Sequence, residues 1–267
     1  MLKFYASAFC CTIVEFDVMG NHYHFITQMD KQRKLSPAEL RRRAEILYSE
    51  SYINSHFLKQ EDWDKFELRL FDLSKLLHVL DGEFAKWFNK THDRRGAFWA
   101  SRFQSNILAT LKDVQNCMMY VNLNPVRAKI VQRPEDYEGS GIYLRDKGRA
   151  DWLMDLGEIF GKTKSERMLL KEYRYRLYYR GDVQDMRGPI KIPKRIREME
   201  IAAGYPTPGV YLDQFAYFVR GLILGPANFI LQMIKKQDIQ KLHKRPITPV
   251  QPDNCPNFIL NKPRETG

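Results

Sequence analysis

Two histidines separated by one residue are the clearest candidates for chemistry in this sequence. His22 and His24 lie in a run where Val14, Phe16 and Val18 alternate with other residues, which is the period of a β-strand. Both imidazoles are therefore expected on one face of a strand. Two neutral imidazoles on a rigid face form half of a site for a divalent metal ion. Such pairs also arise by chance, so the rest of the chain has to complete the site.

A tyrosine and an asparagine one helical turn apart are the second candidate. The residues from Thr110 to Asp113 read as a capping box that opens a helix. Its expected apolar face consists of Leu111, Val114, Cys117, Met118 and Val121. Tyr120 lies off that stripe, and Asn124 follows four residues later on the same, exposed side. Pro125 is expected to stop or kink the helix, which leaves Tyr120 and Asn124 available to the histidine pair.

The histidines need a strand and a turn to position them. Residues 1–8 read as the last turns of a helix, and residues 9–19 as a strand rich in β-branched and aromatic side chains. Gly20-Asn21 is a hairpin turn signal, and residues 22–28 read as the second strand. This order of helix, strand, turn and strand predicts an α+β sheet.

Helices are expected to follow the hairpin. Ser36 and Pro37 predict a helix that runs to Tyr48, whose Arg41-Arg42-Arg43 triplet reads as a solvated face. Residues 49–64 read as an irregular connection with short helical pieces. From Leu73 onward, apolar residues recur with the period of an amphipathic helix.

A basic loop and aromatic residues follow that helix, before a short strand expected at residues 104–108. Cations beside aromatic rings suit single-stranded nucleic acid, because cations neutralise phosphates while rings offer stacking faces. The rings of Phe98, Trp99 and Phe103 are interpreted as core anchors instead. The loop cations Lys90, Arg94 and Arg95 are the better candidates for phosphate contact.

Composition narrows the class of protein. The 267 residues carry a formal charge of +11, so a polyanion is the first partner to test. No run approaches the length of a membrane-spanning helix and no signal peptide is recognisable, so a cytoplasmic protein with no membrane partner is expected. The four cysteines show no CxxC pairing and read as buried, reduced thiols.

The C-terminal part is basic and mainly helical. Residues 129–149 read as a boundary. Residues 165–180 predict a helix in which tyrosines alternate with arginines, either a DNA-binding face or a helix packed through its tyrosines. Basic residues recur over 187–197, and residues 211–233 predict two apolar helices joined by a tight turn. The expected organisation is a domain at 1–145, a helical region at 146–240 that could bind DNA, and a flexible tail at 241–267.

Read together, these segments resemble the single-tyrosine HUH transposases, specifically the REP-associated tyrosine transposases of the IS200-like superfamily. That family carries a Met-Pro-Asn-His-x-His segment, here Met19-Gly20-Asn21-His22-Tyr23-His24 with glycine replacing proline. It also carries Gly-x-x-Trp-x-x-Arg-Phe, matched by Gly96-Ala-Phe-Trp-Ala-Ser-Arg-Phe103, and a tyrosine element matched by Tyr120-Val-Asn-Leu-Asn-Pro-Val-Arg-Ala128. Pro134-Glu-Asp-Tyr137 fits the next segment, so the resemblance covers roughly the first 145 residues.

The resemblance implies a metal-dependent enzyme that cleaves and rejoins single-stranded DNA beside hairpins formed by palindromic repeats. Tyr120 would be the nucleophile and form a 5′-phosphotyrosine bond. His22, His24 and Asn124 would hold Mg²⁺ or Mn²⁺. The residues expected to contact DNA are Lys90, Arg94, Arg95, Arg102 and Arg127. The protein would act in a bacterial cytoplasm as a monomer or homodimer.

The implied fold is a ferredoxin-like antiparallel sheet with packing helices. In that fold the first strand and most of the first helix would precede Met1, so this chain is expected to begin inside the first helix. Two other functions remain open: a truncated or domesticated relative that binds hairpin DNA without cutting it, and an RNA-binding protein whose His-Tyr-His strand is structural.

Overall fold

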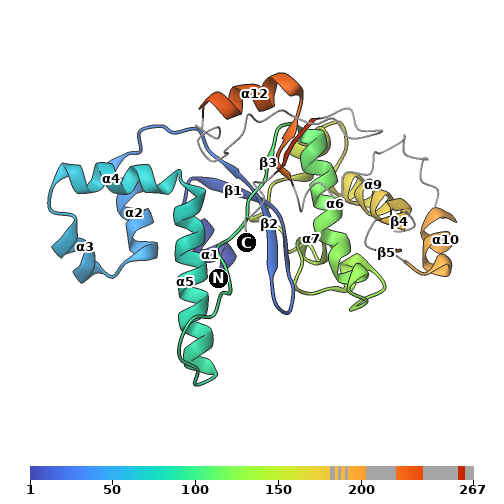
Figure 1. Cartoon of the computed structure of the whole chain (residues 1–267), viewed down its shortest axis with the longest axis horizontal. Coiled ribbons are helices and arrows are strands. Elements are labelled where there is room, and N and C mark those ends of the chain that lie inside the picture. The colour runs from blue at the N-terminus through green and yellow to red at the C-terminus, as the bar shows by residue number, and fades with distance from the viewer. Residues whose placement is uncertain (181–183, 186–187, 190–191, 203–220, 237–257, 262–267) are drawn as a thin grey trace. The chain divides into compact units, whose positions relative to one another are not determined.

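The chain is a mixed α+β protein in the computed structural model, which describes residues 1–180, 184–185, 188–189, 192–202, 221–236 and 258–261 (Figure 1). The α-helices are α1 (Leu2–Ala6), α2 (Pro37–Leu47), α3 (Glu50–His56), α4 (Gln60–Leu70), α5 (Leu73–Thr91), α6 (Leu111–Arg127), α7 (Gly141–Asp146), α8 (Leu156–Phe160), α9 (Glu166–Arg180), α10 (Lys194–Ala202) and α12 (Ala227–Lys236). The strands are β1 (Cys11–Val18), β2 (Tyr23–Met29), β3 (Ile107–Leu108), β4 (Gln184–Asp185), β5 (Gly188–Pro189), β6 (Gly221–Gly225) and β7 (Phe258–Asn261).

The chain divides into two compact units. The first comprises Met1–Val14 and Thr27–Gln104, and the second comprises Glu15–Ile26 and Ser105–Gly267. The tip of the β1–β2 hairpin, which carries both histidines, therefore belongs to the second unit. The domain boundaries expected from the sequence stay predictions, and most of the expected tail at 241–267 lies outside the described residues.

The order of helix, strand, turn and strand predicted for residues 1–28 is confirmed. The short helix α1 leads into β1, residues 20 and 21 form the bend, and β2 follows. β1 and β2 form a two-stranded antiparallel sheet. The N–H of Met19 donates to the carbonyl of His22 at 2.8 Å, so a two-residue loop closes the hairpin beside the first histidine.

The helices α2 and α5 are confirmed. The connection between them has the short helical pieces expected from the sequence, although it is helical over more residues than predicted. It contains α3 and α4, which are short and bury narrow stripes through Ile53, Phe66 and Leu70. Ser49 caps α3 by accepting a hydrogen bond from the N–H of Tyr52 at 3.3 Å. The helical period was hidden because these helices expose most of their surface.

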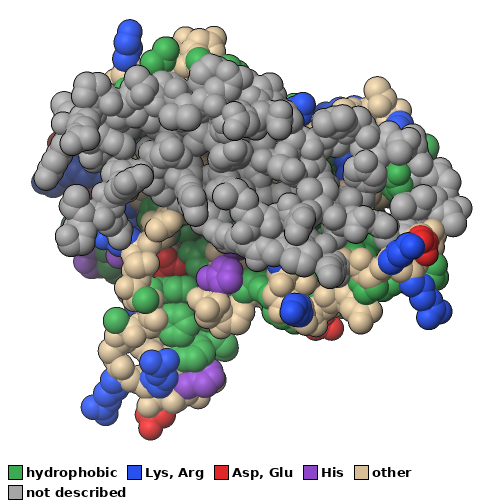
Figure 2. Space-filling model, turned by 45° about the vertical axis from the view of Figure 1, so that its right-hand side comes forward, with side chains coloured by type: hydrophobic (Ala, Val, Ile, Leu, Met, Phe, Trp, Pro, Cys, Tyr) green, Lys and Arg blue, Asp and Glu red, His purple; other side chains and the backbone are tan. Residues whose placement is uncertain are grey.

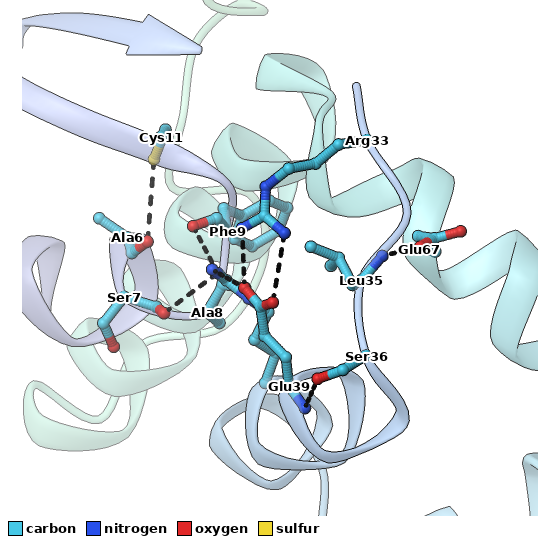
Figure 3. Close-up of polar contacts among 11 residues, drawn as sticks. Ala6, Ser7, Ala8, Phe9, Cys11, Arg33, Leu35, Ser36, Glu39 and Glu67 are labelled. Atoms are coloured by element: carbon cyan, nitrogen blue, oxygen red, sulfur yellow. Dashed lines mark hydrogen bonds and ion pairs between the residues drawn. The ribbon is translucent and has the colours of Figure 1, made fainter. Parts of the chain in front are cut away.

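The arginine triplet of α2 is not wholly solvated, as had been expected. Arg43 is buried, with an exposed fraction of 9%. Its guanidinium donates to the carbonyl oxygens of Ala8 at 2.9 Å and Phe9 at 2.8 Å, and pairs with Glu39 at 3.0 Å. Figure 3 shows Ala8 and Phe9 in the turn between α1 and β1, with Glu39 nearby. Arg43 therefore holds the chain that enters β1 against α2.

Replacing Arg43 by alanine is expected to lower the free energy of unfolding by about 3 kcal/mol, because two buried carbonyls lose a charged donor. The exposed neighbour Arg42→Ala is the matched control and should change stability by less than about 0.5 kcal/mol. Urea denaturation followed by circular dichroism measures both. Equal stability of the two variants would contradict the assigned role of Arg43.

The aromatic residues after α5 do not anchor the core, which corrects their interpretation from sequence. Phe98 and Trp99 are half-buried, and Phe103 is 39% exposed. Trp87 at the end of α5 is also exposed, at 48%. The core of the first unit lies elsewhere, in a cluster that includes Leu40, Ile53, Phe66 and Leu70.

The second unit holds the long helix α6 and a small sheet. Pro125 lies inside α6, which continues to Arg127 instead of ending at the proline. Strand β6 lies between β3, with which it runs parallel, and β7, with which it runs antiparallel. The two apolar helices predicted over 211–233 are therefore wrong in part: 221–225 is a strand, 227–236 is α12, and 211–220 lies outside the described residues.

The basic helix α9 packs through its tyrosines, the second of the two interpretations open from sequence. Tyr173, Tyr175 and Tyr178 are buried. Arg174 pairs with Glu135 at 2.6 Å, so it serves contacts within the unit. No helix in the described part of the chain is long and apolar enough to cross a membrane.

Candidate active site

The hairpin presents the two histidines side by side. Their ring centroids are 5.0 Å apart, with the rings at 80° to each other. The Nδ1 atom of His22 lies 2.7 Å from the side-chain oxygen of Asn21. If Nδ1 carries the proton and donates to that oxygen, Nε2 of His22 is left as the metal-binding nitrogen. The expected placement of both imidazoles on one face fits this geometry.

A segment from later in the chain braces the same end of β1. The N–H of Val18 donates to the carbonyl of Gly139 at 2.9 Å, and the Tyr137 hydroxyl donates to the carbonyl of Val18 at 2.7 Å. Asp17 also forms an antiparallel bridge with Ser140. The edge of β1 that faces away from β2 is thus paired near the histidines.

His24 is neutral at physiological pH. Burial, together with the charge of His22, lowers its pKa from 6.5 to about 4. Deprotonated imidazole is the form that binds a metal ion, so no proton has to be displaced from His24 at neutral pH.

Tyr120 meets the histidine hairpin in the second unit. Its ring centroid lies 5.8 Å from that of His24, with the rings at 75°. The capping box predicted for the start of α6 is present, since Thr110 accepts from the N–H of Asp113 and the Asp113 side chain accepts from that of Thr110. Tyr120 is only 6% exposed, so its prediction on an exposed helical face is wrong.

Asn124 and Arg127 follow Tyr120 along α6. Arg127 is two turns later, and its guanidinium carbon lies 4.9 Å from the centre of the Tyr120 ring. Asn124, one turn after Tyr120, is 9% exposed rather than solvated, and its amide nitrogen has no hydrogen-bond partner within the described residues. A buried amide with an unsatisfied donor is costly, so its place beside Tyr120 calls for a specific reason.

The residues fit a partial metal site. The described residues contain no group of three or more His, Cys, Asp or Glu side chains placed to hold a metal ion. Among the described residues, His22 and His24 would thus supply the ligands of those types, and the amide oxygen of Asn124 is the further protein donor expected from sequence. A site with so few protein ligands leaves coordination positions for phosphate oxygens.

The remaining cations expected to bind DNA belong to the first unit. Lys90, Arg94, Arg95 and Arg102 are all exposed, and none of them forms an ion pair with another described residue. Arg127 is the one member of the predicted DNA-contacting set in the second unit.

Sequence reasoning missed the buried charges behind the hairpin. Glu15 and Asp17 alternate with the apolar residues of β1, and both are fully buried. Glu15 pairs with Arg145 of α7 at 3.5 Å. Two acidic residues at period two inside an apolar strand were the available signal, because they must point to the face opposite Val14 and Phe16.

Helix α6 contributes to the same buried network. The side-chain amide of Asn122 donates to the Tyr173 hydroxyl of α9 at 2.6 Å. Hydrogen bonds from Asn122 and Arg145 oppose the effect of burial on Glu15, whose pKa is nevertheless raised above its usual value. The network links α9 and β1, the strand that pairs with the histidine-bearing strand β2, to α6, which carries Tyr120.

No protein family model matches this sequence, and neither a curated protein nor a solved structure shows detectable similarity to the chain.

Proposed function

We propose that this chain is a transposase or single-strand endonuclease that cuts and rejoins DNA through Tyr120. The observation that carries the proposal is the contact between the rings of His24 and Tyr120, 5.8 Å apart. These residues come from a hairpin and a helix that are far apart in the sequence. His24 belongs to the histidine motif and Tyr120 to the tyrosine motif of the HUH transposases that the sequence resembles.

The chemistry assigned to Tyr120 is a reversible phosphoryl transfer. Its phenolic oxygen forms a bond to the scissile phosphorus while the bond from phosphorus to the 3′ oxygen breaks. The net result moves the phenolic proton to the departing oxygen and leaves a 5′-phosphotyrosine and a free 3′-OH. Attack of a 3′-OH from another strand reverses the step and rejoins the DNA.

Four residues support Tyr120 in this proposal. His22, His24 and Asn124 would hold Mg²⁺ or Mn²⁺. The bound ion would polarise the scissile phosphate. Arg127, beside the Tyr120 ring, would hold the phosphate and offset its negative charge.

The proposed substrate is single-stranded DNA next to a hairpin. The formal charge of +11 favours a polyanion, and the exposed cations Lys90, Arg94, Arg95 and Arg102 would contact its backbone. A ferredoxin-like arrangement of the sheet and a monomeric or homodimeric state belong to the same proposal.

A second candidate function is binding of hairpin DNA without cleavage. The observation that favours it is the low exposure of Tyr120, 6%, because a buried phenol has to be uncovered before it can reach a phosphate. The two functions share a substrate and differ in whether a covalent bond forms.

A covalent-adduct assay separates the two functions. The chain is incubated with a labelled single-stranded hairpin oligonucleotide and Mn²⁺, and protein–DNA adducts are resolved on a denaturing gel. We expect an adduct that is lost in Tyr120→Phe and after chelation with EDTA, because the first change removes the attacking oxygen and the second removes the ion.

The matched control is Tyr143→Phe on α7, which removes a phenolic oxygen from another tyrosine of the second unit and should leave the adduct intact. Binding of the oligonucleotide by the unmodified chain with no adduct would refute the enzymatic proposal and support binding alone.

A further inference from the structure

A cluster of aromatic rings lies at the C-terminal end of α5 and in the loop that follows it. We call it the ring cluster; its members are Phe84, Trp87, Phe88, Phe98 and Trp99. Neighbouring ring centroids are separated by 4.7 to 6.4 Å. None of the five side chains is buried, and Trp87 is 48% exposed. Large rings gathered outside a core mark an interaction surface more often than a packing defect.

The loop that carries the later rings is tied to α5 by hydrogen bonds. The indole N–H of Trp99 donates to the carbonyl of Asp81 at 2.9 Å. The side-chain amide of Asn89 donates to the carbonyl of Gly96 at 3.0 Å. These contacts fix the rings of the loop against the helix, so a ligand that stacks on them would lose little entropy in ordering the platform.

Positive charge surrounds the ring cluster. Residues 84–103 contain five Lys or Arg residues and one acidic residue, Asp93. Lys86 pairs with Glu83 at 2.6 Å, which leaves the four cations Lys90, Arg94, Arg95 and Arg102 for a ligand. The Arg94 guanidinium carbon lies 5.8 Å from the Phe88 ring, and the His92 imidazole stacks on the same ring at 4.0 Å. Figure 2 shows hydrophobic side chains among Lys, Arg and His side chains at the lower end of the molecule, where α5 ends in Figure 1.

We infer that the ring cluster binds unpaired bases of single-stranded DNA, while the cations of the loop contact the phosphates between those bases. Exposed rings offer stacking faces to any base, and uncompensated cations gain by releasing the counterions of a polyanion. A duplex hides its bases from such rings. An acidic protein segment would satisfy the cations but would leave the rings without a specific partner. The choice of DNA over RNA rests on the proposed function.

Binding of a fluorescein-labelled single-stranded oligonucleotide of about 20 thymidines tests the inference. The full chain carries Tyr120→Phe and EDTA is present, so the result is independent of cleavage chemistry and separable from the adduct assay. Fluorescence anisotropy should show Trp87→Ala binding about 5- to 150-fold more weakly, the loss expected for one stacked base. Trp87→Phe, which keeps a ring, should recover most of the affinity.

The matched control is Tyr52→Ala on α3, because Tyr52 is another exposed aromatic residue of the first unit, at 41%. It should bind as tightly as the parent chain, and thermal melting confirms that both alanine variants are folded. Unchanged affinity of Trp87→Ala, or an equal loss in Tyr52→Ala, would overturn the inference.

A second oligonucleotide with abasic sites in place of bases keeps the phosphates and removes the stacking partners. We expect it to bind weakly and to be insensitive to Trp87→Ala. If Trp87→Ala weakens binding of the abasic strand as much as binding of the thymidine strand, Trp87 does not act by stacking. If a uridine strand binds more tightly than the thymidine strand, the ligand is RNA and the assignment to DNA is wrong.

Discussion

Replacing Arg145 by methionine is expected to lower the free energy of unfolding by about 3–5 kcal/mol, because it leaves the Glu15 carboxylate buried without its counter-charge. Arg145 pairs with Glu15 and Glu166, each at 3.5 Å, and donates to the carbonyl of Met154 at 2.9 Å. Glu15 is fully buried. Methionine keeps much of the volume of arginine, so the loss measures mainly charge and hydrogen bonding.

The pH dependence of this loss has a defined sign. Burial raises the pKa of Glu15, and the charge of Arg145 opposes that rise. Without Arg145 the folded chain favours protonated Glu15 more strongly, so the defect should be larger at about pH 8 than at about pH 5. Urea denaturation at both values measures it. The exposed Arg149→Met is the control, and a defect in Arg145→Met no larger than in this control would contradict the role of the ion pair.

The Asp17→Asn variant is expected to be more stable than the parent chain at about pH 8, by up to about 4 kcal/mol. Asp17 is fully buried, and neither carboxylate oxygen has a hydrogen-bond partner within the described residues. Burial, with a smaller contribution from the charge of Glu15, raises the pKa of Asp17 from 3.8 to about 7. Ionisation of Asp17 is therefore costly in the folded chain.

The sign follows from proton binding. Between pH 3.8 and about pH 7 the folded chain keeps a proton on Asp17 that the unfolded chain releases, so stability falls as pH rises through this window. The advantage of Asp17→Asn should grow over the same window and vanish near its lower end. Thermal melting of both chains across the range measures it. The exposed Asp136→Asn is the control, and its effect on stability should not change with pH over this window. If the advantage of Asp17→Asn is also independent of pH, the charge of Asp17 is not its cause.

Local signals in the sequence predicted the elements that carry the candidate site. Alternation and the Gly20-Asn21 turn located the hairpin, and the capping box at Thr110 located the start of α6. These signals succeed because hairpin turns and helix caps depend on a few adjacent residues. They also placed His24 and Tyr120 in segments that the structure brings together.

Burial was harder to predict, because it depends on which segments meet in three dimensions. Tyr120 and Asn124 looked exposed by helical period, yet the hairpin and the helices of the second unit leave them 6% and 9% exposed. Arg43 looked like part of a solvated triplet, although its place beside the carbonyls of Ala8 and Phe9 makes it a buried donor. The parallel pairing of β3 with β6 joins segments more than 100 residues apart and leaves no local trace.

The pairing of Gly139 and Ser140 with the end of β1 also has a consequence for association between molecules. An unpaired strand edge is a template for a strand from another chain and so promotes aggregation. Near the histidines, β1 has β2 on one side and residues 137–140 on the other, so neither edge is open there. β6 is likewise paired on both sides. The outer edge of β1 is thus closed at the hairpin tip, so this edge is not available as a template for a strand from a neighbouring molecule.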